Sequence, residues 1–214
     1  MLGYRRPVVS SAVFLDGAGN EIAYGSRWGE GGPPDNSYSV TSNLKRFQPI
    51  QDVADALVEW LTRSYDVQII RTATVASDLL HRRDDVTRAV RITPSHRAAA
   101  PVTFVYTSFP SVIIHAGELH DFPFPFCGCD ACDESWESAV DELEWTVLTI
   151  VRGGYRERIE PDKELGVHYS LVEPGISSRS GQNRATDYPP DRLEHAVANL
   201  PEAAWAAWEP RDDT

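Results

Sequence analysis

Two stretches of the chain repeat apolar residues with a helical period, and the region between them consists of short β-like runs. Apolar side chains recur at spacings of three and four over about residues 51–64 and 133–151, which predicts two amphipathic helices. The intervening runs, rich in β-branched and aromatic residues, cover residues 67–74, 87–93, 102–107 and 111–115. The order helix, strands, helix predicts an α+β fold with a mainly antiparallel sheet and helices packed on one face.

The chain divides into three segments. Residues 1–37 are predicted to be irregular, because glycine and proline are dense from residue 24 onward. Residues 38–172 are the predicted α+β core domain, closed by a strand at 166–172. Residues 173–214 are predicted to be a tail, with a polar loop at 174–190 and a short helix at 191–200.

All three cysteines, Cys127, Cys129 and Cys132, fall within six residues, between a predicted strand and the second helix. An odd, tightly spaced set does not resemble a secreted disulfide framework, so we expect reduced thiols and a cytoplasmic protein. Three soft thiolates on a tight turn, with Gly128 permitting unusual backbone angles and His120 close upstream, suit a tetrahedral zinc site. The predicted metal ligands are therefore Cys127, Cys129 and Cys132, with His120 or a nearby carboxylate as the fourth.

Two other interpretations of the cysteines stay open. The thiols can simply pack beside the helix, as free cysteines often do. Cys129 and Cys132 also form a Cys-x-x-Cys pair at a helix N-terminus, where a thiolate is stabilised and redox chemistry becomes available. Against the redox interpretation, the negative charges of Asp130, Asp133 and Glu134 oppose thiolate formation.

The charge of the chain bears on its partners. A formal net charge of -12 opposes binding to phosphate backbones, so we expect no nucleic-acid partner. No apolar run approaches the length of a membrane span, so we expect no membrane partner either. We expect a monomer or weak homodimer. Five arginines offer a forked geometry for anions, but pairing with neighbouring carboxylates is the expectation for them: Arg152, Arg156, Arg158, Arg179 and Arg184.

Three segments carry a family resemblance: residues 38–47, residues 100–110, and residues 124–134, which read FPFCGCDACDE. Together they resemble an uncharacterised actinobacterial family of domains of unknown function. The likeness covers roughly residues 38–158, and the flanks are expected to be particular to this protein. The resemblance implies no activity.

These observations favour a soluble, non-enzymatic domain with a structural zinc site at the cysteine cluster. The alternatives are a thiol-based redox enzyme and a module that binds a small ligand or a protein. In the binding module, Phe122, Phe124 and Phe126 would line a groove.

Overall fold

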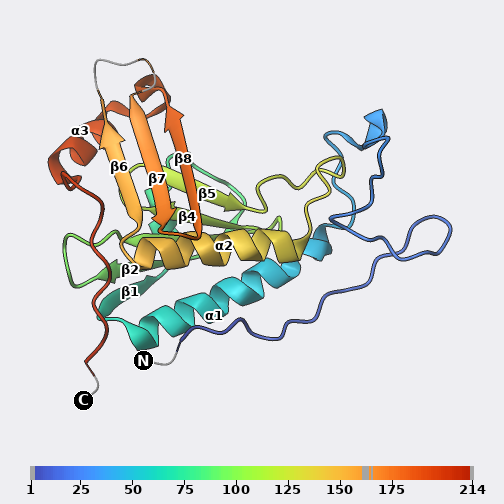
Figure 1. Ribbon diagram of the computed structural model, residues 1–214, viewed down its shortest axis with the longest axis horizontal. Coiled ribbons are helices and arrows are strands. Elements are labelled where there is room, and N and C mark those ends of the chain that lie inside the picture. Colours follow the sequence, from blue (N-terminus) through green and yellow to red (C-terminus); the bar gives the residue numbers. More distant parts are fainter. Residues whose placement is uncertain (1–2, 161–163, 165, 213–214) are drawn as a thin grey trace.

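Five strands form one antiparallel sheet in the order in which they follow one another along the chain (Figure 1). The computed structural model describes residues 3–160, 164 and 166–212. The strands are β1 (Val67–Arg71), β2 (Val86–Pro94), β3 (Val102–Thr107), β4 (Val112–Ala116) and β5 (His120–Phe124). With the helices described next, this arrangement confirms the predicted α+β class.

Two helices lie side by side against one face of this sheet (Figure 1). Helix α1 spans Gln48–Ser64 and α2 spans Trp136–Val151, as the apolar periodicity predicts. Their apolar stripes are buried, with Leu57 on α1 and Leu143 on α2 both fully inaccessible. The side chain of Ser135 caps α2 by accepting a hydrogen bond from the backbone N–H of Ser138, 3.2 Å away.

A second, three-stranded antiparallel sheet stands beside α2 and β5 (Figure 1). It consists of β6 (Tyr155–Ile159), β7 (Val167–Glu173) and β8 (Ser177–Asn183). The predicted loop over residues 174–190 is therefore wrong where β8 forms. The sequence of β8 is polar because most of its side chains are exposed, and its pairing with β7 holds it in place.

The face of the large sheet that points away from α1 and α2 is partly covered by a 3-10 helix, η3 (Ala73–Asp78). The predicted strand over residues 67–74 therefore ends at Arg71. Val75 and Leu79 pack against an apolar row of the sheet formed by Ala89, Val105 and Ile113. The sheet is thus covered on one face by helices and on part of the other by η3.

Described residues before α1 and after β8 pack against the main core. Two short 3-10 helices, η1 (Asp35–Ser37) and η2 (Leu44–Phe47), lead into α1. After β8 come a short 3-10 helix, η4 (Ala185–Asp187), and helix α3 (Pro190–Asn199). The tail that follows α3 inserts Trp205 and Trp208 into the main core, where both are buried. No helix in the described part of the chain is long and apolar enough to cross a membrane.

Candidate metal centre

The three cysteine sulfur atoms converge on the loop that joins β5 to α2. All three Sγ atoms lie within 4.8 Å of one another, and those of Cys127 and Cys129 are 3.3 Å apart. Cys127 and Cys129 are half-buried, and Cys132 is exposed. Among the described residues, these cysteines form the one group of three or more potential ligands with such spacing. The structure therefore brings together three of the four residues predicted to bind metal.

The cysteine loop, residues 125–134, is closed by Glu134 and packed at Gly128. The Glu134 carboxylate accepts hydrogen bonds from the backbone N–H groups of Phe126 (3.1 Å) and Cys127 (2.9 Å). A Cβ atom on Gly128 would lie 2.4 Å from Cζ of Phe109, so a larger residue here would force the ring of Phe109 to move. Close packing, and not the unusual backbone angle expected from the sequence, explains this glycine.

A buried arginine joins the cysteine loop to the start of α1. Arg46, whose side chain is 2% exposed, donates to Asp130 Oδ1 at 2.9 Å and to the Gly128 carbonyl at 3.0 Å. The backbone N–H of Ser42 also donates to Asp130. Burial by itself raises the pKa of Asp130, but the hydrogen bonds from Ser42 and Arg46 outweigh it and hold this pKa below its ordinary value.

A second arginine joins the cysteine loop to the N-terminal segment. Arg27 pairs with Asp133 through its side chain and its backbone N–H, and it donates to the Asp130 carbonyl at 2.6 Å. Both guanidinium groups lie over the ring of Tyr24, Arg27 at 4.5 Å and Arg46 at 4.4 Å from its centroid. Sequence reasoning missed Arg27 and Arg46, because they lie far from the cysteines along the chain and no spacing links them.

These arginines change the electrostatics expected of the thiols. The charges of Asp130 and Asp133 are offset by Arg46 and Arg27, so they oppose thiolate formation less than the sequence indicates. The Cys132 backbone N–H and the Cys127 thiol donate to the sulfur of Cys129, which lowers the pKa of Cys129 to about 7. The pKa of Cys132 is raised to about 12, because its thiol is hydrogen-bonded to Cys127 and Cys129. Cys129 therefore loses its proton more readily than Cys132.

His120, the fourth predicted ligand, lies in the core and outside the thiol group. Its Nδ1 is 2.9 Å from Oε1 of Glu157, and its ring packs 4.8 Å from the centroid of Tyr169. It starts β5 with its side chain on the buried face, which places it among core residues. The groove expected from three phenylalanines does not form, because Phe122 and Phe124 are buried in the core while Phe126 is 83% exposed.

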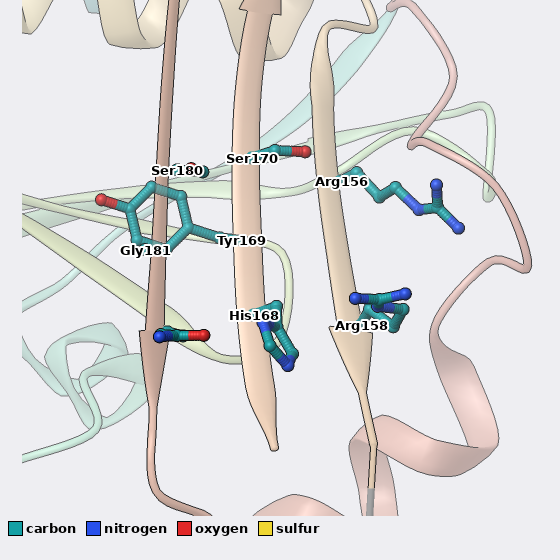
Figure 2. A pocket seen from close by; sticks show the side chains of 8 residues that line it. Arg156, Arg158, His168, Tyr169, Ser170, Ser180 and Gly181 are labelled. Carbon is teal, nitrogen blue, oxygen red and sulfur yellow. The ribbon is translucent and has the colours of Figure 1, made fainter. Parts of the chain in front are cut away.

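The arginines considered for anion binding are mostly paired with carboxylates. The pairs are Arg152 with Glu173, Arg158 with Glu160, Arg179 with Glu142 and Arg184 with Glu164. Figure 2 shows Arg156 and Arg158 beside His168 and Ser170 on the outer face of the small sheet, in a shallow cavity of about 520 Å³. Arg156 reaches the carbonyl of Glu202 at 3.5 Å. The expected pairing thus accounts for four of the five.

Replacing Arg46 with methionine is expected to lower the free energy of unfolding by about 2–4 kcal/mol, because the buried carboxylate of Asp130 loses its closest cation. Urea unfolding followed by circular dichroism measures this change. The matched control is Arg82→Met, since the Arg82–Asp84 pair is more than 90% exposed and contributes little. Equal stability of the two variants would show that Arg46 does not hold the loop.

Fold and site together define an α+β domain of two antiparallel sheets with a cysteine-bearing loop at the junction between β5 and α2. The chain belongs to a family of unknown function, DUF6226, whose model matches residues 10–212. The match includes the flanks on both sides of residues 38–158, so the expectation that they are particular to this protein is wrong. No curated protein and no solved structure matched the chain.

Proposed function

We propose that the cysteine loop binds one zinc ion through Cys127, Cys129 and Cys132, and that the ion has a structural role in a non-enzymatic domain. The convergence of three sulfur atoms within 4.8 Å carries this proposal. Zn–S bonds of about 2.3 Å in a tetrahedron place thiolate sulfurs about 3.8 Å apart, so the cluster needs little rearrangement. Soft thiolate ligands favour zinc over the harder divalent ions.

The proposed site has three protein ligands. His120 is engaged by Glu157 in the core, and Glu134 is engaged by two backbone N–H groups of the loop. The exposed side of the cluster is at Cys132. We therefore expect the fourth ligand to approach the ion from this exposed side.

A zinc ion at this loop would stabilise more than the loop itself. The loop backbone also pairs with the N-terminal segment, because Asp130 N–H donates to the Val40 carbonyl at 2.7 Å and Ala131 N–H donates to the Ser37 carbonyl at 3.1 Å. Together with Arg27 and Arg46, these contacts make the loop the anchor for residues 27–46. Metal binding to such a loop is coupled to the folding of what it holds.

The test is metal analysis of the tag-free protein combined with thiol alkylation and thermal unfolding. We expect one equivalent of zinc, three protected thiols, and a lower melting temperature when a chelator removes the ion. When the free zinc concentration is about 100 times Kd, zinc binding adds about 2.7 kcal/mol to the free energy of unfolding.

Two variants make the test specific. Cys132→Ser removes an exposed ligand with little effect on packing, and it should lose zinc. Phe126→Ser changes an exposed residue of the same loop that offers no ligand, and it should keep zinc. His120→Gln should also keep zinc. The proposal would be overturned if the protein held no stoichiometric metal and its melting temperature did not change when a chelator was added.

A thiol redox role is the second candidate, favoured by the 3.3 Å separation of the Cys127 and Cys129 sulfurs. In exchange with a small disulfide such as oxidised glutathione, these two thiols would form a bond and the small disulfide would be reduced to two thiols. Intact-mass analysis after such treatment separates the candidates. Rapid loss of two hydrogens from metal-free protein favours exchange, whereas zinc-protected thiols favour the structural site.

We also propose a soluble cytoplasmic protein that is a monomer or weak homodimer without affinity for nucleic acid. The net charge of -12 and the reduced thiols support this. Sedimentation and a DNA-binding titration at physiological salt test it, and sub-micromolar binding to random duplex DNA would contradict it.

A further inference from the structure

A row of polar residues crosses the large sheet on the face opposite α1 and α2. The strand register places Arg91 on β2 opposite Thr103 on β3, Thr103 opposite His115 on β4, and His115 opposite Asp121 on β5. The apolar row of Ala89, Val105 and Ile113 lies two residues further along the same face, and η3 covers it. Three members of the polar row, Arg91, Thr103 and His115, instead line a cavity of about 540 Å³.

Hydrogen bonds fix the polar row in one arrangement. Asp78, at the end of η3, accepts from Thr103 at 2.6 Å and from Arg91 Nε at 2.7 Å. Asp121 binds Nδ1 of His115 at 2.7 Å through one oxygen and accepts the Leu80 N–H at 2.9 Å through the other. Because Nδ1 of His115 is engaged by Asp121, the other ring nitrogen, Nε2, is the one left for the cavity.

These bonds also anchor η3 to the sheet, and anchoring alone explains Arg91, Thr103 and Asp121. It does not explain why a buried histidine, 4% exposed, lines an open cavity in place of an apolar residue. A row of apolar side chains would cost less to bury. A role for His115 at the cavity accounts for this cost.

The rest of the cavity wall presents charges of both signs. Glu118 follows β4, and Arg192 comes from the first turn of α3. Glu118 is half-buried, with His195 Nε2 3.5 Å from its carboxylate, and burial raises the pKa of Glu118. Arg192 donates to the carbonyl of Ser77 at 3.2 Å, and it shares the cavity wall with the carboxylates of Glu118 and Asp191. By contrast, the charge of Arg91 is offset by Asp78.

We propose that this cavity binds a small zwitterion of the free amino-acid class. The carboxylate of Glu118 and Nε2 of His115 accept hydrogen bonds from the ammonium group, and the guanidinium of Arg192 binds the carboxylate. A volume of about 540 Å³ suits a ligand of this size, since small-molecule sites span about 300–1,000 Å³. The site is independent of the cysteine loop.

The experiment uses the full-length protein labelled with 15N and titrated with the common L-amino acids at up to about 10 mM, well above a millimolar Kd. Amide and histidine side-chain spectra report binding and the tautomer of His115. We expect saturable shifts at the cavity for at least one amino acid. The same amino acid with its carboxylate amidated, or with its ammonium acetylated, should bind at least ten-fold more weakly.

Variants at the cavity wall assign the contacts. Glu118→Gln and Arg192→Gln each remove a charge and should weaken binding at least ten-fold, whereas Arg158→Gln on the outer face of β6 should not. His115→Phe tests the Nε2 acceptor, and its fold is checked by its amide spectrum. No saturable shift with any amino acid, or equal shifts with the singly charged derivatives, would overturn the proposal.

Discussion

Replacing Glu157 with alanine is expected to lower the free energy of unfolding by about 3–5 kcal/mol, because it removes the acceptor of four donors, among them the buried Leu119 N–H and the buried indole N–H of Trp205. The carboxylate is fully buried in the space between the two sheets and accepts hydrogen bonds from the backbone N–H groups of Glu118 (3.0 Å) and Leu119 (2.8 Å). Nδ1 of His120 (2.9 Å) and Nε1 of Trp205 (3.0 Å) are its other partners. One side chain of β6 thus joins the hairpin of β4 and β5 to the C-terminal tail.

The stabilisation from Glu157 should depend on pH. Burial alone raises its pKa, but the hydrogen bond and charge of His120 and the two N–H groups outweigh burial, so the pKa is lower in the folded protein. A group whose pKa is lower in the folded protein contributes its full stabilisation at pH values above its unfolded-state pKa, which is about 4.3 for glutamate. This stabilisation is lost as the pH falls through the folded-state pKa. The stability difference between wild type and Glu157→Ala should therefore narrow at acid pH.

Urea unfolding of both proteins across the acid range measures this dependence. Glu157→Gln keeps one acceptor oxygen but replaces the other with an amide group that faces donors. Its free energy of unfolding should therefore lie between those of wild type and Glu157→Ala. Asp84→Asn, at a side chain 92% exposed, is the control and should change little. A pH-independent difference between wild type and Glu157→Ala would contradict an ionised carboxylate at this position.

Replacing Val147 with aspartate is expected to cost at least about 4 kcal/mol, enough to unfold a marginally stable domain. Val147 is fully buried on the stripe of α2 that faces the core, and the substitution removes apolar contacts while burying a carboxylate. Circular dichroism and thermal unfolding measure the result.

Two neighbours on α2 calibrate that result. Leu143→Ala, also fully buried, should cost about 2–5 kcal/mol and leave a folded protein. Glu142→Ala, whose side chain is 49% exposed, should change stability by less than about 0.5 kcal/mol even though it pairs with Arg179. Similar melting temperatures for all three variants would show that this stripe is not core.

The sequence predicted those elements in which buried positions carry apolar residues. Helices α1 and α2 have apolar stripes that face the core, and β3 and β4 consist mostly of β-branched and aromatic residues, so their sequences indicate their structure directly. The same rule fails for β6, where Tyr155 and Ile159 point inward but the inward position between them is the charged Glu157. Tertiary hydrogen bonds satisfy this residue, and no local pattern indicates them.

Two other strands were missed for different physical reasons. Strand β5 contains Pro123, which is tolerated because β5 is the edge strand of the large sheet. Strand β8 offers few apolar side chains, and Gly181 makes room for the ring of Tyr169 on β7.

The cysteine cluster follows directly from sequence spacing, because its members fall within six consecutive residues. The residues that support the cluster do not, since Arg27 and Arg46 come from a segment about 80–100 residues earlier. The polar row on the large sheet was missed for the same reason. Only the strand register aligns Arg91, Thr103 and His115, which belong to three different strands.

The buried tail has a consequence for folding during synthesis. Trp205 hydrogen-bonds Glu157, Trp208 Nε1 donates to the Ala100 carbonyl at 2.9 Å, and Pro210 forms a bridge with Tyr65 at the end of α1. The core therefore stays incomplete until these late residues leave the ribosome, and contacts of such high sequence separation form slowly. A nascent chain stalled before Trp205 would leave part of the apolar core uncovered, so the domain reaches its native state only after residues 205–210 have been added.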